Sequence, residues 1–239
     1  MKKTTLLVFI ICFSYSGKAQ SGYFMDDNSQ YAVIKDTDGF VNIRRAPNSN
    51  APIIGKIKKY EVFMCDRTQT NWWKVLYTQY DSHTKSIWLD GYIYKNRVSL
   101  LTHWKPINKK DSISLIVKDA PFEPKKHSLS YSSDNSEKNA SNDLIKIDGK
   151  VFWGTDGEIP KKVISHAEVT IKGTKVILPK NTFDDLYEPG LGDISICHGP
   201  ENTLYVKIED NSDGAGAYTV IWIIKDNKYY GRYIDDSNV

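Results

Sequence analysis

A short alternating segment near the start of the chain constrains the fold most strongly. It covers residues 38–57, Asp-Gly-Phe-Val-Asn-Ile-Arg-Arg-Ala-Pro-Asn-Ser-Asn-Ala-Pro-Ile-Ile-Gly-Lys-Ile. Successive strand side chains point to opposite faces, so Val41 and Ile43 share one face, while Asn42 and Arg44 share the other. The alanine-proline pair that follows ends the run before a second apolar stretch begins. The pattern predicts two strands joined by a turn, the first with one apolar face.

These residues resemble the opening of a bacterial SH3-like (SH3b) domain. In that family an Asp-Gly turn leads into a Leu/Val-Asn-Val/Ile-Arg strand, a small-Pro turn and a Val/Ile-Ile/Leu-Gly strand, and all three pieces stand here in order. Two later segments are also similar to the family pattern: Trp72-Trp73-Lys74-Val75 to its tryptophan strand, and Gly91-Tyr92-Ile93-Tyr94 to its closing strand.

The resemblance covers about residues 31–104 and implies a small β barrel that binds a ligand. Domains of this family usually tether envelope proteins to peptidoglycan or its peptides, so the expected partner is a cell-wall peptide or an envelope protein. Residues 79–86 depart from the pattern, because they lengthen the hairpin before Ile87-Trp88. We expect residues 31–104 to fold autonomously, since the strand and turn signals close within that window.

Two neighbouring tryptophans suggest where a ligand would lie. If Val75 marks the core face of its strand, Trp73 points inward and Trp72 outward. Trp72 could then form the wall of a peptide groove together with Tyr92 or Tyr94. The alternative is that both tryptophans pack in the interior.

The outward residues of the first strand complete the candidate ligand-binding set. Arg44 and Asn42 could orient a ligand carboxylate or a peptide carbonyl, the arginine through a bidentate contact. The alternative is an ordinary solvated polar face. The candidate set is therefore Asn42, Arg44, Trp72, Tyr92 and Tyr94.

The N-terminus predicts export. Lys2-Lys3 precedes an apolar stretch over residues 6–13 that is too short to span a bilayer, and small residues surround a cleavage point after Ala19. Residues 1–19 are thus expected to be a signal peptide, and the mature protein periplasmic or secreted, with no transmembrane segment. Lipidation at Cys12 is the alternative, but Ile11 occupies the position where a lipobox needs a small residue.

Removal of the signal peptide changes the charge argument. The formal net charge of +3 falls to zero, since 29 basic and 29 acidic residues remain. The basic isoelectric point therefore does not indicate nucleic-acid binding. The charge is nevertheless uneven: residues 31–104 carry a net +5 and residues 143–239 a net −5.

The rest of the chain reads as a second domain, residues 105–239, of the same all-β class. A boundary near residue 105 separates the first pattern from a new strand-like run over residues 112–122. A polar stretch, residues 128–142, is expected to be a mobile loop, although it could instead be the domain boundary. Three hairpins are expected around the turns Asp148-Gly149, Lys172-Gly173-Thr174 and Asp226-Asn227, with one short helix over residues 181–187.

Two segments of this second region resemble uncharacterised exported bacterial proteins. They are residues 147–157, Ile-Asp-Gly-Lys-Val-Phe-Trp-Gly-Thr-Asp-Gly, and residues 211–218, Asn-Ser-Asp-Gly-Ala-Gly-Ala-Tyr. That resemblance supports a real domain and implies no activity.

The sequence gives little support for a catalytic site or a metal site. A cysteine hydrolase needs a histidine tens of residues after its nucleophile, but Cys197 is followed only by His198, which a strand would place on the opposite face. Cys65 lies inside the strand pattern of the first domain, and both cysteines are expected to be buried free thiols rather than an interdomain disulfide. The five histidines show no metal-binding spacing, and residues 209–214 lack the ligand pattern of a calcium loop. We expect neither enzyme activity nor a cofactor.

Two functions remain. The first is a non-catalytic envelope protein whose SH3-like domain binds peptidoglycan peptide or a protein segment. The second is a periplasmic inhibitor or immunity-type protein that masks a partner, and a cell-wall hydrolase is a distant third.

The first prediction concerns processing. We expect the exported protein to begin near Gln20, because a charged start, an apolar run and small residues before the cleavage point occur in that order. Intact-mass and N-terminal analysis of the protein from its envelope fraction will measure this. A diacylglycerol on Cys12, or a mature start elsewhere, would overturn the assignment.

Overall fold

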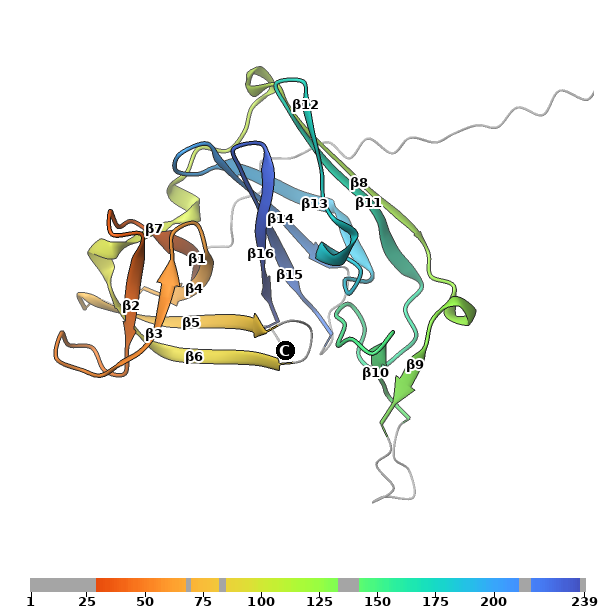
Figure 1. Ribbon diagram of the computed structural model, residues 1–239, viewed down its shortest axis with the longest axis horizontal. Coiled ribbons are helices and arrows are strands. Elements are labelled where there is room, and N and C mark those ends of the chain that lie inside the picture. Colours follow the sequence, from red (N-terminus) through yellow and green to blue (C-terminus); the bar gives the residue numbers. More distant parts are fainter. Residues whose placement is uncertain (1–28, 68–69, 82–84, 133–141, 211–215, 237–239) are drawn as a thin grey trace, which may run out of the picture.

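The protein is built almost entirely from β-strands. The computed structural model describes residues 29–67, 70–81, 85–132, 142–210 and 216–236, so the expected signal peptide lies outside the described residues. Within those ranges the regular elements are strands and single 3-10 turns, arranged as sheets of seven, four, three and two strands (Figure 1). The predicted all-β class is confirmed.

The first part of the chain forms the seven-stranded sheet, in the order β3-β2-β6-β5-β4-β1-β7. In Figure 1, β5 and β6 run steeply across β1 to β4, so the sheet is strongly curved. The strands are β1 Ser29–Ile34, β2 Phe40–Arg44, β3 Ile53–Lys58, β4 Val62–Asp66, β5 Trp72–Asp81, β6 Lys85–Tyr94 and β7 Val98–Leu100.

Alternation sorts the side chains of this sheet as expected. Val41 and Ile43 are buried in β2, whereas Asn42 and Arg44 are only partly buried. The inward residues from all parts of the sheet, among them Ile57, Phe63 and Val75, form one apolar cluster inside its curve. Burial of alternate side chains explains why the segment forms strands.

The second part of the chain contains a two-layer sandwich. One layer is the sheet β12-β11-β8, built from β8 Ile113–Pro121, β11 Lys162–Ile171 and β12 Thr174–Ile177. The other is the antiparallel sheet β13-β14-β15-β16, built from β13 Pro189–His198, β14 Thr203–Asp210, β15 Thr219–Lys225 and β16 Lys228–Asp235.

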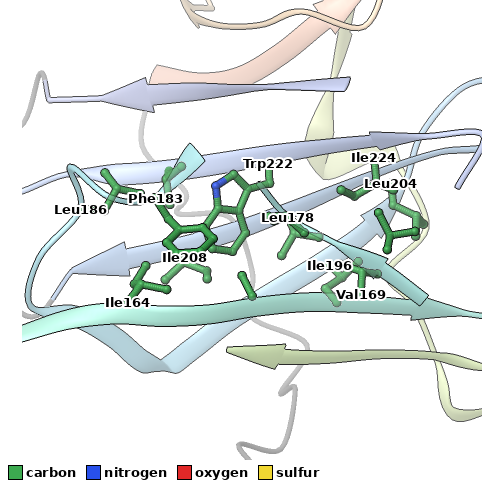
Figure 2. Packing of buried hydrophobic residues seen from close by; sticks show 14 of the residues in the cluster. Ile164, Val169, Leu178, Phe183, Leu186, Ile196, Leu204, Ile208, Trp222 and Ile224 are labelled. Carbon is green, nitrogen blue, oxygen red and sulfur yellow. The ribbon is translucent and has the colours of Figure 1, made fainter. Parts of the chain in front are cut away.

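The sandwich core lies between these layers (Figure 2). Trp222 is fully buried at its centre, with its ring 6.5 Å from that of Phe183. The indole nitrogen donates a hydrogen bond to the carbonyl oxygen of Thr182 at 3.2 Å, so the large side chain is buried with its polar atom satisfied.

Two of the three predicted hairpins are confirmed. β11 and β12 flank the turn at Lys172-Gly173, and β15 and β16 flank Asp226-Asn227. The φ angles at these four residues lie between +47° and +84°, which suits the primed turns of two-residue hairpins.

The hairpin expected around Asp148-Gly149 is only half correct. The turn exists, with positive φ angles at both residues, but residues 151–153 do not return as a strand. Instead β10 Leu144–Ile147 pairs with β9 Leu129–Tyr131, and Trp153 forms an isolated bridge to Leu186. The expected loop over residues 128–142 therefore begins as a strand, and residues 133–141 lie outside the described residues.

The short helix predicted for residues 181–187 is wrong. A single 3-10 turn, η5 Lys180–Thr182, stands there, and Phe183 at its end has φ −151° and ψ 3°, outside the helical region. The backbone beyond it is held by other segments: Trp153 N–H donates to the Asp185 carbonyl, and Tyr187 N–H donates to the Trp153 carbonyl. These contacts replace the intrahelical hydrogen bonds.

The two parts of the chain share a third apolar cluster. Val33 and Val62, which point outward from the first sheet, and Leu101 pack against the second face of the four-stranded sheet. Two hydrogen bonds at the edge of this cluster also join the two parts of the chain. The Tyr31 hydroxyl donates to Asp235 Oδ2 at 2.6 Å, and the Tyr60 hydroxyl donates to Glu201 Oε2 at 2.5 Å. The four-stranded sheet contributes Cys197, Tyr205, Ile221, Ile223 and Tyr233.

The second prediction follows from this shared cluster. A fragment of residues 31–104 would expose Val33, Val62 and Leu101, which are at most 1% exposed in the whole chain. Burying each such side chain contributes about 1.5–3 kcal/mol, so we expect the fragment to melt more than about 10 °C below the full chain. Thermal denaturation followed by circular dichroism measures this. Equal melting temperatures would show that residues 31–104 do not depend on the second part of the chain.

Candidate functional site

The outer face of the seven-stranded sheet has a covered half and an open half. On β1 and β4 the outward side chains, including Val33 and Val62, are buried under the four-stranded sheet. Except for Thr78 in β5, which is buried, the described outward side chains of β2, β5 and β6 are partly or fully exposed, among them Tyr94 at 36%. We call this second half the open face.

Four of the five predicted site residues come together on the open face. In the strand register Arg44 lies opposite Tyr92, and Trp72 lies opposite Tyr94. Residues two positions apart on one strand share a face, so both pairs point to the same side of the sheet. The structure thus places Arg44, Trp72, Tyr92 and Tyr94 on one continuous surface.

Trp72 and Tyr94 form the aromatic part of this surface. Their ring centroids are 5.5 Å apart at an interplanar angle of 71°, an edge-to-face contact. Trp73 packs instead against the apolar cluster inside the sheet, as strand alternation predicts. An aromatic pair of this kind offers apolar area together with polar atoms, which suits contact with a peptide.

Arg44 is held by a hydrogen bond within the protein, and Asn42 is partly covered. Arg44 Nη1 donates a hydrogen bond to the carbonyl oxygen of Ala51 at 2.8 Å and so braces the turn between β2 and β3. The amide oxygen of Asn42 is buried without a hydrogen-bond partner. A ligand could therefore reach the remaining guanidinium nitrogens of Arg44, whereas the Asn42 oxygen is covered.

Sequence reasoning missed two cations on the same face. Lys74 lies opposite Tyr92 and pairs with Asp90 at 3.2 Å. Lys56 lies opposite Asn42, with its ammonium 4.4 Å from the ring centroid of Phe40. Alternation within β5 places Lys74 on the face of Trp72, and the pairing of β3 with β2 places Lys56 opposite Asn42.

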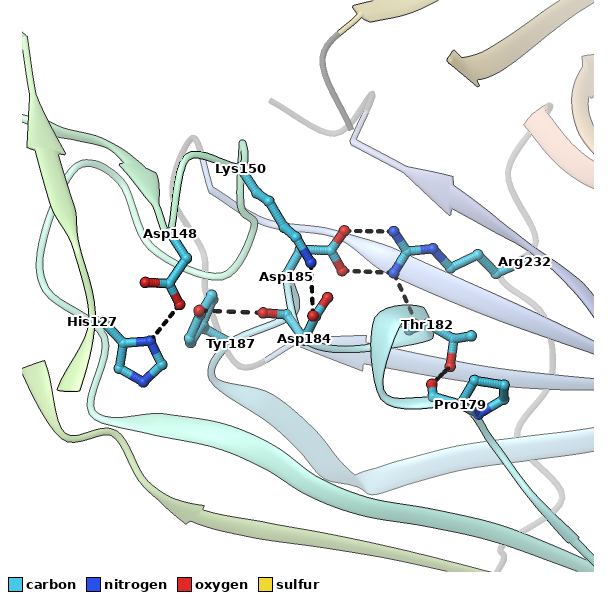
Figure 3. Close-up of polar contacts among 9 residues, drawn as sticks. All are labelled: His127, Asp148, Lys150, Pro179, Thr182, Asp184, Asp185, Tyr187 and Arg232. Carbon is cyan, nitrogen blue, oxygen red and sulfur yellow. Dashed lines mark hydrogen bonds and ion pairs between the residues drawn. The ribbon is translucent and has the colours of Figure 1, made fainter. Parts of the chain in front are cut away.

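A second polar cluster, also missed from sequence, lies beside η5 (Figure 3). Asp185 and Arg232 form a bidentate pair at 2.6 and 2.5 Å, and Arg232 also donates to the Thr182 carbonyl at 2.9 Å. Burial lowers the pKa of the Arg232 guanidinium, but the hydrogen bonds and charge of Asp185 outweigh it and raise that pKa. The pair ties residues 182–185 to β16, so its role is structural.

Further ion pairs extend this cluster along the turn at residue 148. Lys150 Nζ donates to Asp184 at 2.7 Å, and His127 Nδ1 lies 2.7 Å from Asp148. Burial raises the pKa of the Asp148 carboxyl, but the contacts with His127 and with Ser128 N–H lower it overall. These contacts fasten the turn to its neighbours.

The described end of the 211–218 segment lies against the 147–157 segment. Gly154 N–H donates to the Gly216 carbonyl at 2.8 Å, and Tyr218 donates to the Tyr187 carbonyl at 3.1 Å. A Cβ atom on Gly216 would lie 2.0 Å from the Thr155 carbonyl oxygen. This close backbone approach explains why glycine stands there.

Among the described residues, no hydrogen bond joins Cys65 or Cys197 to a histidine. Cys65 and Cys197 are free and buried, and burial raises the pKa of each thiol to about 12. His198 contacts Asp111 at 3.3 Å. Thiolate is the nucleophilic form of cysteine, so neither thiol is activated.

The described ranges contain no group of three or more His, Cys, Asp or Glu placed to hold a metal ion. They also contain no helix with the length and apolarity needed to cross a membrane.

The third prediction tests the buried ion pair. Asp185→Ala leaves the guanidinium of Arg232, which is 17% exposed, without its carboxylate, and we expect a loss of about 3–5 kcal/mol in the free energy of unfolding. Urea denaturation measures the loss. Asp119→Ala is the control, because its pair with Lys162 is more exposed and is worth about 1 kcal/mol or less. Equal losses in the two variants would contradict the structural role.

No family model, curated protein or solved structure matches the chain.

Proposed function

We propose that this chain is an exported, non-catalytic binding protein of the cell envelope. Its first sheet would act as an SH3-like module whose open face binds a peptidoglycan peptide or a protein segment. The observation that carries the proposal is the Trp72–Tyr94 pair, which lies on the open face in the same register as Tyr92 and Arg44.

The division of the outer sheet face supports this assignment. Outward apolar side chains on β1 and β4 pack against the four-stranded sheet, so they contribute to the stability of the fold. Trp72 and Tyr94 are not part of that cluster, and Tyr94 keeps 36% of its surface exposed. Aromatic side chains left open beside an arginine are enriched where proteins bind one another.

The chemistry of the thiols supports the non-catalytic part. Cys197 is 2% exposed and lies in the cluster between the two parts of the chain. A cysteine hydrolase would need that thiol to reach both substrate and base. An inhibitor that masks a partner protein remains the competing function, and the experiment below separates the two.

The fourth prediction concerns binding to the cell wall. We expect Trp72→Ala to keep the fold and to weaken cosedimentation with purified sacculi about thirtyfold, because truncating a binding anchor costs about 2 kcal/mol or more. Circular dichroism checks the fold. Tyr131→Ala is the matched control, since Tyr131 is a 38% exposed aromatic residue on β9, away from the open face.

The outcomes separate the candidate functions. Equal binding by Trp72→Ala and the parent would remove the open face from the proposal. A parent protein that never binds sacculi would favour the inhibitor, whose partner is then sought in the envelope fraction. Release of peptides from sacculi, lost on Cys197→Ser, would establish a hydrolase.

A further inference from the structure

The hairpin formed by β2 and β3 carries the positive charge of the first part of the chain. Residues 40–60 contain five basic residues and no aspartate or glutamate. That net +5 equals the net charge of residues 31–104 as a whole. The five are Arg44, Arg45, Lys56, Lys58 and Lys59.

Most of this charge is not neutralised within the protein. Lys59 pairs with Glu201 at 2.5 Å. In the described part of the chain, none of the other four has a carboxylate oxygen within 4.0 Å of its charged nitrogens. Glu61, just beyond the hairpin, accepts hydrogen bonds from the Lys58 backbone N–H and the Tyr77 hydroxyl.

β3 is also an open strand edge. It stands at the end of the seven-stranded sheet, and among the described residues it pairs with no strand except β2. Lys56 and Lys58 are two residues apart, so they share the outer face, and both are exposed. Ile53, at the start of the strand, is 51% exposed and offers an apolar contact.

We propose that the edge of β3 binds an extended acidic segment of a partner protein, which adds a strand to the sheet. Its acidic side chains stand at alternate positions and face Lys56 and Lys58, while its backbone hydrogen-bonds to the edge. This inference rests on the proposed function and deepens it, because it names the chemistry of the bound segment.

The strand edge and the charge together identify the occupant. A second copy of β3 is disfavoured, because lysines on an edge repel an identical edge. A polyanion without peptide groups would use the cations and leave the strand edge unpaired. An acidic peptide satisfies both the cations and the backbone.

The test uses a fluorescein-labelled peptide of sequence Thr-Val-Glu-Val-Glu-Val-Thr and the full mature chain. Fluorescence anisotropy measures its affinity for the parent protein. We expect Lys56→Glu combined with Lys58→Glu to weaken binding at least about tenfold, because two attractive contacts become repulsive. The control is Lys146→Glu with Lys161→Glu, which makes the same charge change at two exposed lysines outside the hairpin and should leave binding unchanged.

Two further arms test the strand geometry. A peptide with lysines in place of its glutamates should bind the Lys56→Glu, Lys58→Glu variant better than the parent. N-methylation of alternate amides in the glutamate peptide should abolish binding through loss of the edge hydrogen bonds. An N-methylated peptide that binds as tightly as its parent would overturn strand addition.

The remaining outcomes keep this inference distinct from the proposed function. If the parent protein does not bind the glutamate peptide, or if the control variant loses affinity equally, the inference fails. Sacculus binding that depends on Trp72 would then still support the proposed function. Conversely, glutamate-peptide binding with the expected lysine dependence supports the inference even when sacculi are not bound.

Discussion

Burial of the four-stranded sheet on both faces is the constraint on which the rest of the structure depends. One face packs against β8, β11 and β12 around Trp222, and the other packs against the first sheet through Ile221 and Ile223. Six consecutive residues of β15 are therefore buried. Because apolar burial drives folding, this double burial joins both parts of the chain into one body.

That junction also decides which surface is left for binding. The outward side chains of β1 and β4 serve folding, since Val33 and Val62 lie under the four-stranded sheet. Outward side chains beyond this cover, among them Arg44, Trp72 and Tyr94, are partly or fully exposed. The hydroxyl of Tyr31, bonded to Asp235, marks the covered side. The proposed binding surface and the junction thus occupy the two halves of one sheet face.

The cationic hairpin of β2 and β3 places positive charge beside this surface. Its free strand edge and its lysines lie next to the aromatic pair through β2 and β6. Among the described residues of the acidic second part of the chain, Glu201 is the one carboxylate paired with the hairpin. Most of the positive charge of the hairpin therefore has no carboxylate partner among the described residues. In the proposal above, this charge attracts an acidic segment.

Local patterns in the sequence determined the all-β class, the alternation of β2, the inward Trp73 and two of the three hairpins, because side-chain period and turn residues act over a few residues. Tertiary structure decided the rest. Residues 181–187 do not form a helix, because Trp153 hydrogen-bonds to the backbone of Asp185 and Tyr187. The same contact holds Trp153 in an isolated bridge, so residues 151–153 do not form the second strand of a hairpin. Two features depend on contacts between residues that are distant in the chain: the half of the first sheet that stays open, and the pairing of Asp185 with Arg232. A local sequence pattern does not contain such contacts.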